Sequence, residues 1–267
     1  SAMSTSILGP TLDIHGGGRD LIFPHHENEI AQSEGAYGVP FVRYWVHNGF
    51  VTISGEKMSK SLGNFLTIRE LAAEVHPEVL RLLLISQHYR TPINFSKEAV
   101  QTSQQALVRF YEMIDRVARS VSQGSQSRIK DLAAAFEGNF DEAMCDDFNS
   151  ARAIAHLHDL TTEVNRVLDD NPAIPPEDAE ALRSSLGVVQ DVFGILEEEP
   201  GKFLEHMKRA GIAEIGISKE EIEDLIAQRA AARKARDFTK ADEIRSLLLS
   251  KGIALKDTPE GTTWEKV

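Results

Sequence analysis

Apolar residues recur at helical spacing through the middle of this chain, from residue 96 to about residue 199. Positions three or four apart share one face of an α-helix, so each such stripe predicts a helix that buries one side. Three stripes can be followed: Val100, Leu107, Phe110, Ile114 and Val117; Phe148, Ile154, Leu157, Leu160, Val164 and Leu168; and Leu182, Leu186, Val189, Phe193 and Leu196. We therefore expect a helical bundle, with Ser96 capping its first helix and breaks near Gly124 and at residues 171–176.

The stretch from residue 1 to about residue 50 shows another pattern, in which short apolar strands alternate with one helix. This alternation is typical of a parallel nucleotide-binding sheet. Two helices should come next, and the second, opened by Pro77, is apolar on nearly every side and should be buried. Residues 92–96 are expected to form a linker.

The tail predicts a third part. Residues 201–216 look like a polar connection, and Ser218 should cap the first of two helices, which are followed by a small hairpin at 253–255 and 262–264. We therefore predict a mixed, mostly α fold. A remnant of a parallel α/β, Rossmann-like domain (1–95) precedes an α-helical bundle (96–200) and a linker with a small α+β domain (201–267).

Composition bears on the cellular compartment of the protein and on its binding partners. Hydrophobic residues make up 42% of the chain, but no run approaches the roughly eighteen apolar residues of a membrane helix, and no signal peptide opens the sequence. The single cysteine, Cys145, argues for a reducing compartment, so we expect a cytoplasmic protein in which Cys145 is a small buried hydrophobe. The net charge of −12 is unfavourable for RNA binding on average, although local patches decide contacts with phosphates.

Lys57-Met58-Ser59-Lys60-Ser61, flanked by Gly55 and Gly63, carries two lysines three apart around a small hydroxyl residue. A lysine ammonium is a compact charge on a flexible stem, so it can follow phosphate oxygens as negative charge moves. The segment therefore predicts a loop for the phosphates of ATP, with a solvated surface turn as the alternative.

A second group of polar residues lies upstream. Three glycines at 16–18 would let another group approach the backbone, and Asp20 is placed to accept hydrogen bonds from ribose hydroxyls. Pro24 suits the first position of a helix, which puts His25 and Glu29 four apart on one face. Imidazole and carboxylate are both zinc ligands, so the pair predicts half of a metal site; a capping acid beside a satisfied histidine is the alternative.

These motifs resemble a known family. The glycine triplet, Pro-His-His-Glu-Asn-Glu at 24–29, Trp-Val-His-Asn-Gly at 45–49 and the lysine segment occur in the order and spacing of the second half of the catalytic domain of cysteinyl-tRNA synthetases, which are class I enzymes. The resemblance implies that Lys60, and secondly Lys57, contact the phosphates of ATP. It also implies positions beside the adenylate for His15, Gly17, Asp20 and His47.

In that family a zinc ion binds the thiolate of the substrate cysteine. The resemblance implies that His25 and Glu29 are two of its ligands, and that two cysteines are the others. Such a metal separates cysteine from serine because a soft ion prefers thiolate to hydroxyl. The resemblance also places Trp45, like His47, on a strand that lines the adenylate pocket, with plain core packing as the alternative for Trp45.

The tail resembles the domain by which bacterial-type cysteinyl-tRNA synthetases read the anticodon. Four basic residues there are spaced to share one helical face: Arg229, Arg233, Arg236 and Lys240. The resemblance makes them candidate tRNA contacts, with a solvated helix face as the alternative. Trp264 either stacks on a base or acts as a lid on a small core. Asp147 matches a structural cap at the start of a long helix in the bundle, and with no histidine in register nearby a metal role for Asp146 and Asp147 is disfavoured.

The activity implied is the ATP-dependent activation of L-cysteine, with magnesium, and its transfer to tRNA(Cys) by a monomer. Residues 1–3 resemble the segment that follows one zinc-ligand cysteine, and no His-x-Gly-His motif is present. We therefore expect a carboxy-terminal portion of a longer enzyme that alone neither activates cysteine nor holds zinc tightly.

Three alternatives remain. A cysteine ligase that acts on an amino sugar shares the metal site and lysine loop, but that family lacks the anticodon module. An RNA-binding module without catalysis would bind RNA without turning over ATP. A zinc hydrolase built on His25, His26 and Glu29 fits badly, because the three lack two histidines at i, i+4 and a free general base.

Overall fold

A computed structural model describes residues 1–53, 56–57, 67–122, 127–215, 219–234, 237–250, 253–258 and 261–266. The chain divides into two compact units, Ser1–Glu197 and Glu198–Val267, and each is described by itself. No helix in the described ranges has both the length and the apolar character needed to cross a membrane.

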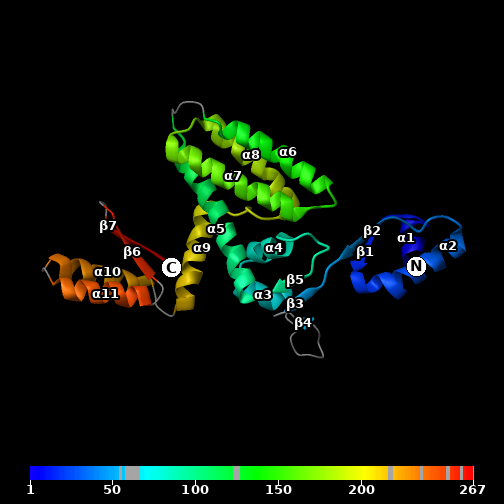
Figure 1. The fold of residues 1–267 in the computed structure, drawn as a ribbon, viewed down its shortest axis with the longest axis horizontal. Coiled ribbons are helices and arrows are strands. Elements are labelled where there is room, and N and C mark those ends of the chain that lie inside the picture. Colours follow the sequence, from blue (N-terminus) through cyan, green and yellow to red (C-terminus); the bar gives the residue numbers. More distant parts are fainter. Residues whose placement is uncertain are drawn as a thin grey trace. The chain divides into compact units, whose positions relative to one another are not determined.

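The first unit opens with a strand–helix–strand motif, drawn in blue in Figure 1. After α1 (Ala2–Leu8), strand β1 (Leu12–Gly18) leads through two short turns, η1 (Arg19–Leu21) and η2 (Ile22–His26), into α2 (Glu27–Tyr37) and β2 (Val42–Asn48). β1 and β2 are parallel, with His15 opposite Trp45 and Gly17 opposite His47. This confirms the predicted alternation of strands with a helix over residues 12–48, whereas α1 is a second helix that was not predicted.

A second small sheet follows, with the strand order β4–β3–β5. β3 (Val51–Ile53) pairs antiparallel with β4 (Glu56–Lys57) and parallel with β5 (Ile93–Phe95). The prediction of a linker at 92–96 is therefore wrong. Three residues are too few to show strand periodicity, and the partner strand that orders them lies 42 residues earlier in the chain, with Val51 opposite Ile93.

Two helices lead to the bundle, as predicted. α3 (Ile68–Glu74) begins with a capping box in which Thr67 and Glu70 satisfy each other's backbone nitrogens. α4 (Pro77–Ile85) buries an apolar face made of Val79, Leu80, Leu82 and Leu83, whereas Leu84 is 47% exposed. The expectation that α4 is buried therefore holds for one side, which packs on α5.

The bundle consists of α5 (Lys97–Ser120), α6 (Ile129–Cys145), α7 (Ser150–Asp170) and α8 (Pro176–Phe193), with α6 packed against both α7 and α8 (Figure 1). Ser96 caps α5 as predicted, since its side chain accepts a hydrogen bond from Ala99 N at 3.2 Å. All five members of the third predicted stripe are buried. Phe148, assigned to the second stripe, is instead 54% exposed, because it lies in the corner before α7 and not on the helix.

The second unit contains α9 (Pro200–Ile215), α10 (Lys219–Lys234), α11 (Phe238–Ser250) and the antiparallel hairpin β6 (Ile253–Thr258) and β7 (Gly261–Lys266). The hairpin is confirmed, but the expected connection at 201–216 is a helix over the residues described. A small core joins α10, α11 and β6, with Trp264 partly buried against it: Ile222, Ile244, Leu248 and Ile253.

Candidate active site

Glu29 lies at the centre of a group of ionisable side chains. It stands in the first turn of α2, and its side chain is only 14% exposed. Its Oε2 atom lies 3.2 Å from His15 Nε2 and 3.8 Å from His25 Nε2, while its Oε1 atom lies 3.4 Å from the nitrogen of Ser1. Oε2 is buried and has no hydrogen-bond partner among the described residues, the His15 contact being outside hydrogen-bond geometry. A carboxylate oxygen in this state is costly unless a cation or a donor reaches it.

Two histidines compete for this carboxylate. His25 comes from the residues just before α2 and is 60% exposed, whereas His15 comes from β1 and is 22% exposed. His15, His26 and Glu29 each offer a ligand atom within 4.8 Å of the others. Spacing along one helix points to His25, but His15 reaches Glu29 only because β1 passes beside α2, and no local sequence signal announces that approach.

His26 is the buried member of the group. Its Nδ1 atom lies 2.8 Å from His47 Nε2, so one of the two rings donates a hydrogen bond to the other. Burial, and secondly the neighbouring His15, hold the pKa of the His26 imidazole below its ordinary value. A Cβ on Gly17 would lie 2.9 Å from His26 Cε1, so glycine at this position lets the ring pack against the strand.

Trp45 joins the aromatic cluster from β2. Its ring centroid lies 4.9 Å from those of both His15 and His26, and its plane is parallel to that of His47. The indole is half-buried. Trp45 therefore packs on the histidines of the site and not inside a closed apolar core.

The other predicted residues of this site are placed only in part. Asp20 lies in η1, and a Cβ on Gly18 would meet its Oδ1 atom at 2.5 Å, so the carboxylate folds back over the end of β1. The backbone of Lys57 lies in β4, opposite Thr52. The Lys57 side chain and the whole of Lys60 lie outside the described residues.

Asp147 forms a polar cluster with the segment after α4. Its Oδ1 atom accepts from the hydroxyl of Tyr89 at 2.7 Å, and its Oδ2 atom lies 2.8 Å from Arg90 Nε and 3.7 Å from His88 Nε2. The Tyr89 hydroxyl, and then Arg90, hold the pKa of the Asp147 carboxyl below its ordinary value. The prediction that Asp147 caps a helix is wrong, because Asn149 caps α7 by accepting from Arg152 N at 3.0 Å.

A histidine does therefore lie near the acids of this corner, contrary to expectation. His88 is 59 residues away in the chain, so spacing could not reveal it. Residues 143–145, just before this corner, form the end of α6. Cys145, expected to be buried, is exposed at the last position of that helix.

The basic residues of the tail do not form one helical face. α10 ends at Lys234 and α11 begins at Phe238, so Arg233 and Lys240 belong to different helices. Arg229 is only 6% exposed, and its Nη1 atom lies 3.5 Å from Thr262 Oγ1, so its burial ties α10 to the hairpin. Arg236 lies outside the described residues.

Trp264 has contacts on two sides. It packs against the small core of the second unit, and the Lys208 ammonium lies 4.2 Å from the centroid of its ring.

Comparison with known proteins gives consistent matches along the chain. Residues 1–105 match the tRNA synthetases class I (C) catalytic domain, residues 139–197 match the DALR domain, and residues 218–264 match the cysteinyl-tRNA ligase anticodon binding domain.

Curated relatives carry the same name. The chain is 48% identical over 272 residues to the cysteine–tRNA ligase of Geobacter sp. (strain M21), covering 99% of this chain and 56% of the relative. It is 46% identical over 266 residues to that of Acinetobacter baumannii (strain SDF), covering 100% of this chain and 54% of the relative. The chain thus spans about half the length of the curated relatives it matches.

Two solved structures share the fold. One is the ternary complex of Agrobacterium radiobacter K84 agnB2 LeuRS with tRNA and LeuAMS, at a TM-score of 0.55 and 18% identity, covering 72% of this chain and 27% of that one. The other is Mycobacterium tuberculosis methionyl-tRNA synthetase in complex with methionyl-adenylate, at a TM-score of 0.52 and 19% identity, covering 78% of this chain and 45% of that one. At such identities the likeness concerns the fold alone.

The parallel β1–β2 motif, the helical bundle and these matches define the chain as part of a class I aminoacyl-tRNA synthetase. Within that class, it belongs to the cysteinyl-tRNA synthetase family.

Proposed function

We propose that this chain supplies part of the machinery of a cysteine–tRNA ligase, which activates L-cysteine with ATP and transfers it to tRNA(Cys). The observation that carries the proposal is the buried Glu29 Oε2 atom, which has histidine nitrogens at 3.2 and 3.8 Å and no hydrogen-bond partner among the described residues. Imidazole nitrogen and carboxylate oxygen are zinc ligands, so the residues present fit a zinc ion.

His25 and Glu29 are the proposed ligands from this chain. When bound, zinc supplies a preference for thiolate over hydroxyl, which would select cysteine over serine. The two thiolate ligands of the family would have to come from elsewhere, because the sequence contains one cysteine, Cys145, which lies at the end of α6.

The proposed ATP and adenylate site comprises Lys57 and Lys60 with His15, Gly17, Asp20 and His47. In the reaction, the cysteine carboxylate attacks the α-phosphorus of ATP and releases pyrophosphate. A terminal ribose hydroxyl of the tRNA then attacks the carbonyl carbon of the cysteinyl adenylate, which transfers the cysteinyl group to the tRNA and releases AMP. The lysines stabilise charge on the leaving phosphates, with magnesium as a further counter-charge.

The proposed protein has three functional parts, the catalytic part at 1–95, the helical bundle at 96–200 and the linker with the anticodon-binding domain at 201–267. It acts as a monomer in the cytoplasm. The match at 218–264 to an anticodon binding domain supports tRNA(Cys) as the partner, and it favours this function over a ligase that acts on an amino sugar. Arg233, Lys240 and Trp264 remain proposed contacts with the tRNA. Arg236 is a further candidate, and Arg229 would act by holding α10 against the hairpin.

Zinc content tests the metal assignment. We would measure zinc per chain by elemental analysis after dialysis, on this chain and on a version extended through the upstream half found in its relatives. One zinc per extended chain is expected, lost in Glu29→Gln and His25→Ala and retained in His206→Ala, an exposed histidine of the second unit. Loss in His15→Ala with retention in His25→Ala would transfer the ligand role to His15.

Pyrophosphate exchange tests the catalytic assignment in the extended protein. Lys60→Ala should lower the rate of cysteine-dependent exchange at least tenfold with little change in the KM for cysteine, because the lost charge acts mainly on the transition state. Lys130→Ala, an exposed lysine of α6, is the matched control. An unchanged rate in Lys60→Ala would contradict the role of Lys60, and cysteine-independent exchange would contradict the proposed substrate.

A further inference from the structure

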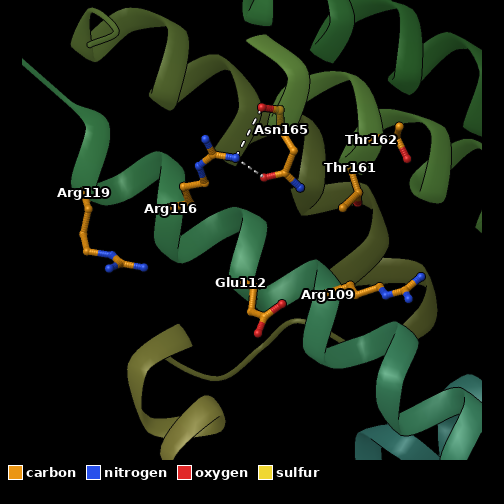
Figure 2. A pocket seen from close by; sticks show the side chains of 7 residues that line it. All are labelled: Arg109, Glu112, Arg116, Arg119, Thr161, Thr162 and Asn165. Carbon is orange, nitrogen blue, oxygen red and sulfur yellow. Dashed lines mark hydrogen bonds between the residues drawn. The ribbon is translucent and has the colours of Figure 1, made fainter. Parts of the chain in front are cut away.

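A polar pocket of about 410 Å³ lies on the helical bundle between α5 and α7 (Figure 2). The uncharged polar side chains of the lining, Thr161, Thr162 and Asn165, come from α7. The charged side chains come from one face of α5, at positions three or four apart: Arg109, Glu112, Arg116 and Arg119. The other side of α5 is core, with Leu107, Phe110 and Met113 fully buried. The charged side chains are therefore carried on a firmly packed helix.

Arg116 is held in place by α7. Its Nη1 atom donates to Asn165 Oδ1 at 3.1 Å and to the Asn165 carbonyl at 3.3 Å, and its Nη2 atom donates to Asp169 at 2.5 Å. Because Oδ1 of Asn165 accepts from Arg116, the amide nitrogen of the same side chain points the other way, toward Thr161 (Figure 2). The two amide hydrogens are thereby presented as donors at the pocket.

Arg109 and Arg119 are less constrained. Arg119 is 73% exposed and pairs with Asp115 on its own helix, an arrangement that contributes little stability. Arg109 is exposed and forms no ion pair with any residue in the described part of the chain, although Glu112 and His158 feel its charge. Both guanidinium groups can therefore turn toward a ligand at small cost.

We propose that this pocket binds a phosphate group of an RNA backbone, with Arg109 as the main contact and with Arg116 and Asn165 as donors already in position. The identity of the RNA rests on the function proposed above, in which tRNA(Cys) is the partner. A guanidinium presents a planar pair of donors that matches two phosphate oxygens. The bundle lies in the chain between the matched catalytic and anticodon segments.

Glu112 makes a second substitution informative, because its effect on binding affinity should be opposite to that of Arg109. It is the only carboxylate in the lining, and its charge opposes a phosphate next to Arg109. Partial burial raises the pKa of Glu112, with the charge of Arg109 acting in the opposite direction. Neutralising Glu112 should therefore tighten binding, whereas removing the charge of Arg109 should weaken it.

The test is a titration of this chain with tRNA(Cys) at several salt concentrations between about 50 and 200 mM. Arg109→Gln should weaken binding roughly tenfold and reduce the slope of log K against log salt by roughly 0.7 to 0.9, as expected for one lost phosphate contact. Glu112→Gln should tighten binding severalfold. Arg183→Gln and Glu180→Gln are matched controls, because they form an exposed i, i+3 pair on α8, and they should change neither quantity.

The outcomes separate this inference from the proposed function. Binding of tRNA(Cys) that is indifferent to Arg109→Gln and Glu112→Gln would overturn the pocket and leave the function standing. Failure of the unsubstituted chain to bind tRNA(Cys) would count against the proposed partner and against the pocket together. Inorganic tripolyphosphate is the second probe: if it binds through Arg109 while tRNA binding ignores that residue, the phosphate source is a free polyphosphate and the RNA assignment is wrong. Thermal melts would show that each variant is folded.

Discussion

The hydroxyl of Tyr111 donates a hydrogen bond shared by both carboxylate oxygens of Glu78, at 3.0 and 2.9 Å. The same carboxylate accepts from the backbone nitrogens of Leu196 at 2.8 Å and Glu197 at 3.1 Å. Glu78 lies in the first turn of α4, Tyr111 lies in α5, and Leu196 follows α8. One buried acid thus joins three parts of the helical core.

Tyr111→Phe should lower the free energy of unfolding by about 2 kcal/mol, because it removes a buried donor to a charged acceptor. Urea unfolding followed by circular dichroism measures this change. Tyr44→Phe is the matched control, since Tyr44 is 69% exposed, and it should cost less than about 0.5 kcal/mol. Equal losses in the two variants would show that the hydrogen bond to Glu78 contributes nothing specific.

Asp147→Asn should lower the melting temperature at pH 7, because it removes the charge that Arg90 and Tyr89 contact. Asparagine tolerates the left-handed backbone of Asp147, whose φ is 54°, so the substitution changes the charge with little strain. The pKa of Asp147 is lower in the folded protein than in the unfolded chain, where it is about 4. The ionised Asp147 therefore stabilises the fold fully at pH values above its unfolded pKa, and this stabilisation is lost as pH falls through its folded pKa.

Melting curves of both proteins from pH 3 to pH 7 measure this dependence. The difference in melting temperature between the wild type and Asp147→Asn should become smaller toward pH 3. Asp146→Asn, at the neighbouring exposed acid, should leave a smaller gap at pH 7. A gap for Asp147→Asn that stays constant across the range would rule out ionisation of Asp147 as its source.

Gly17→Ala should destabilise the first unit by roughly 1 to 3 kcal/mol, because the new methyl would press on His26 and on the Leu21 side chain, 3.0 Å away. Gly35→Ala is the control within the same motif. Gly35 lies in α2 with no atom within 4 Å of the added Cβ, so alanine should stabilise the helix by about 0.5 to 1 kcal/mol. Opposite signs in denaturant unfolding are expected, and a neutral Gly17→Ala would contradict the packing of His26 on β1.

Trp264 can be observed alone by fluorescence in a Trp45→Phe background, because the chain has two tryptophans. Lys208→Ala should shift its emission and lower the stability of the second unit by roughly 0.5 to 1 kcal/mol, through loss of the cation–π contact. Addition of tRNA(Cys) then separates the two roles predicted for Trp264. Strong quenching would indicate stacking on a base, whereas unchanged emission in the bound state would assign it to the core.

Much of the helical architecture could be predicted from local pattern. Ser96, Pro77 and four members of the third apolar stripe lie where helix physics places them, since caps and periodicity act within a few residues. The fifth member, Leu196, is buried but follows the end of α8. α6 has no counterpart among the predicted stripes, although Ile129, Phe136 and Phe140 are spaced at helical intervals. α9 was predicted as a connection, although Phe203 and Met207, both buried, lie four residues apart in it.

By itself, the sequence determined the family, the strand–helix–strand order of residues 12–48, most helices of the first two parts, and the pairing of His25 with Glu29 across one helical turn. These features depend on residues that are neighbours along the chain. Only the tertiary structure decided that His15 faces Glu29, that Asp147 holds Tyr89 and Arg90, that Arg229 is buried and that Glu78 meets Tyr111. Each of these contacts joins side chains from separate elements, and such distances are set by how strands and helices pack and not by the spacing of residues in the sequence.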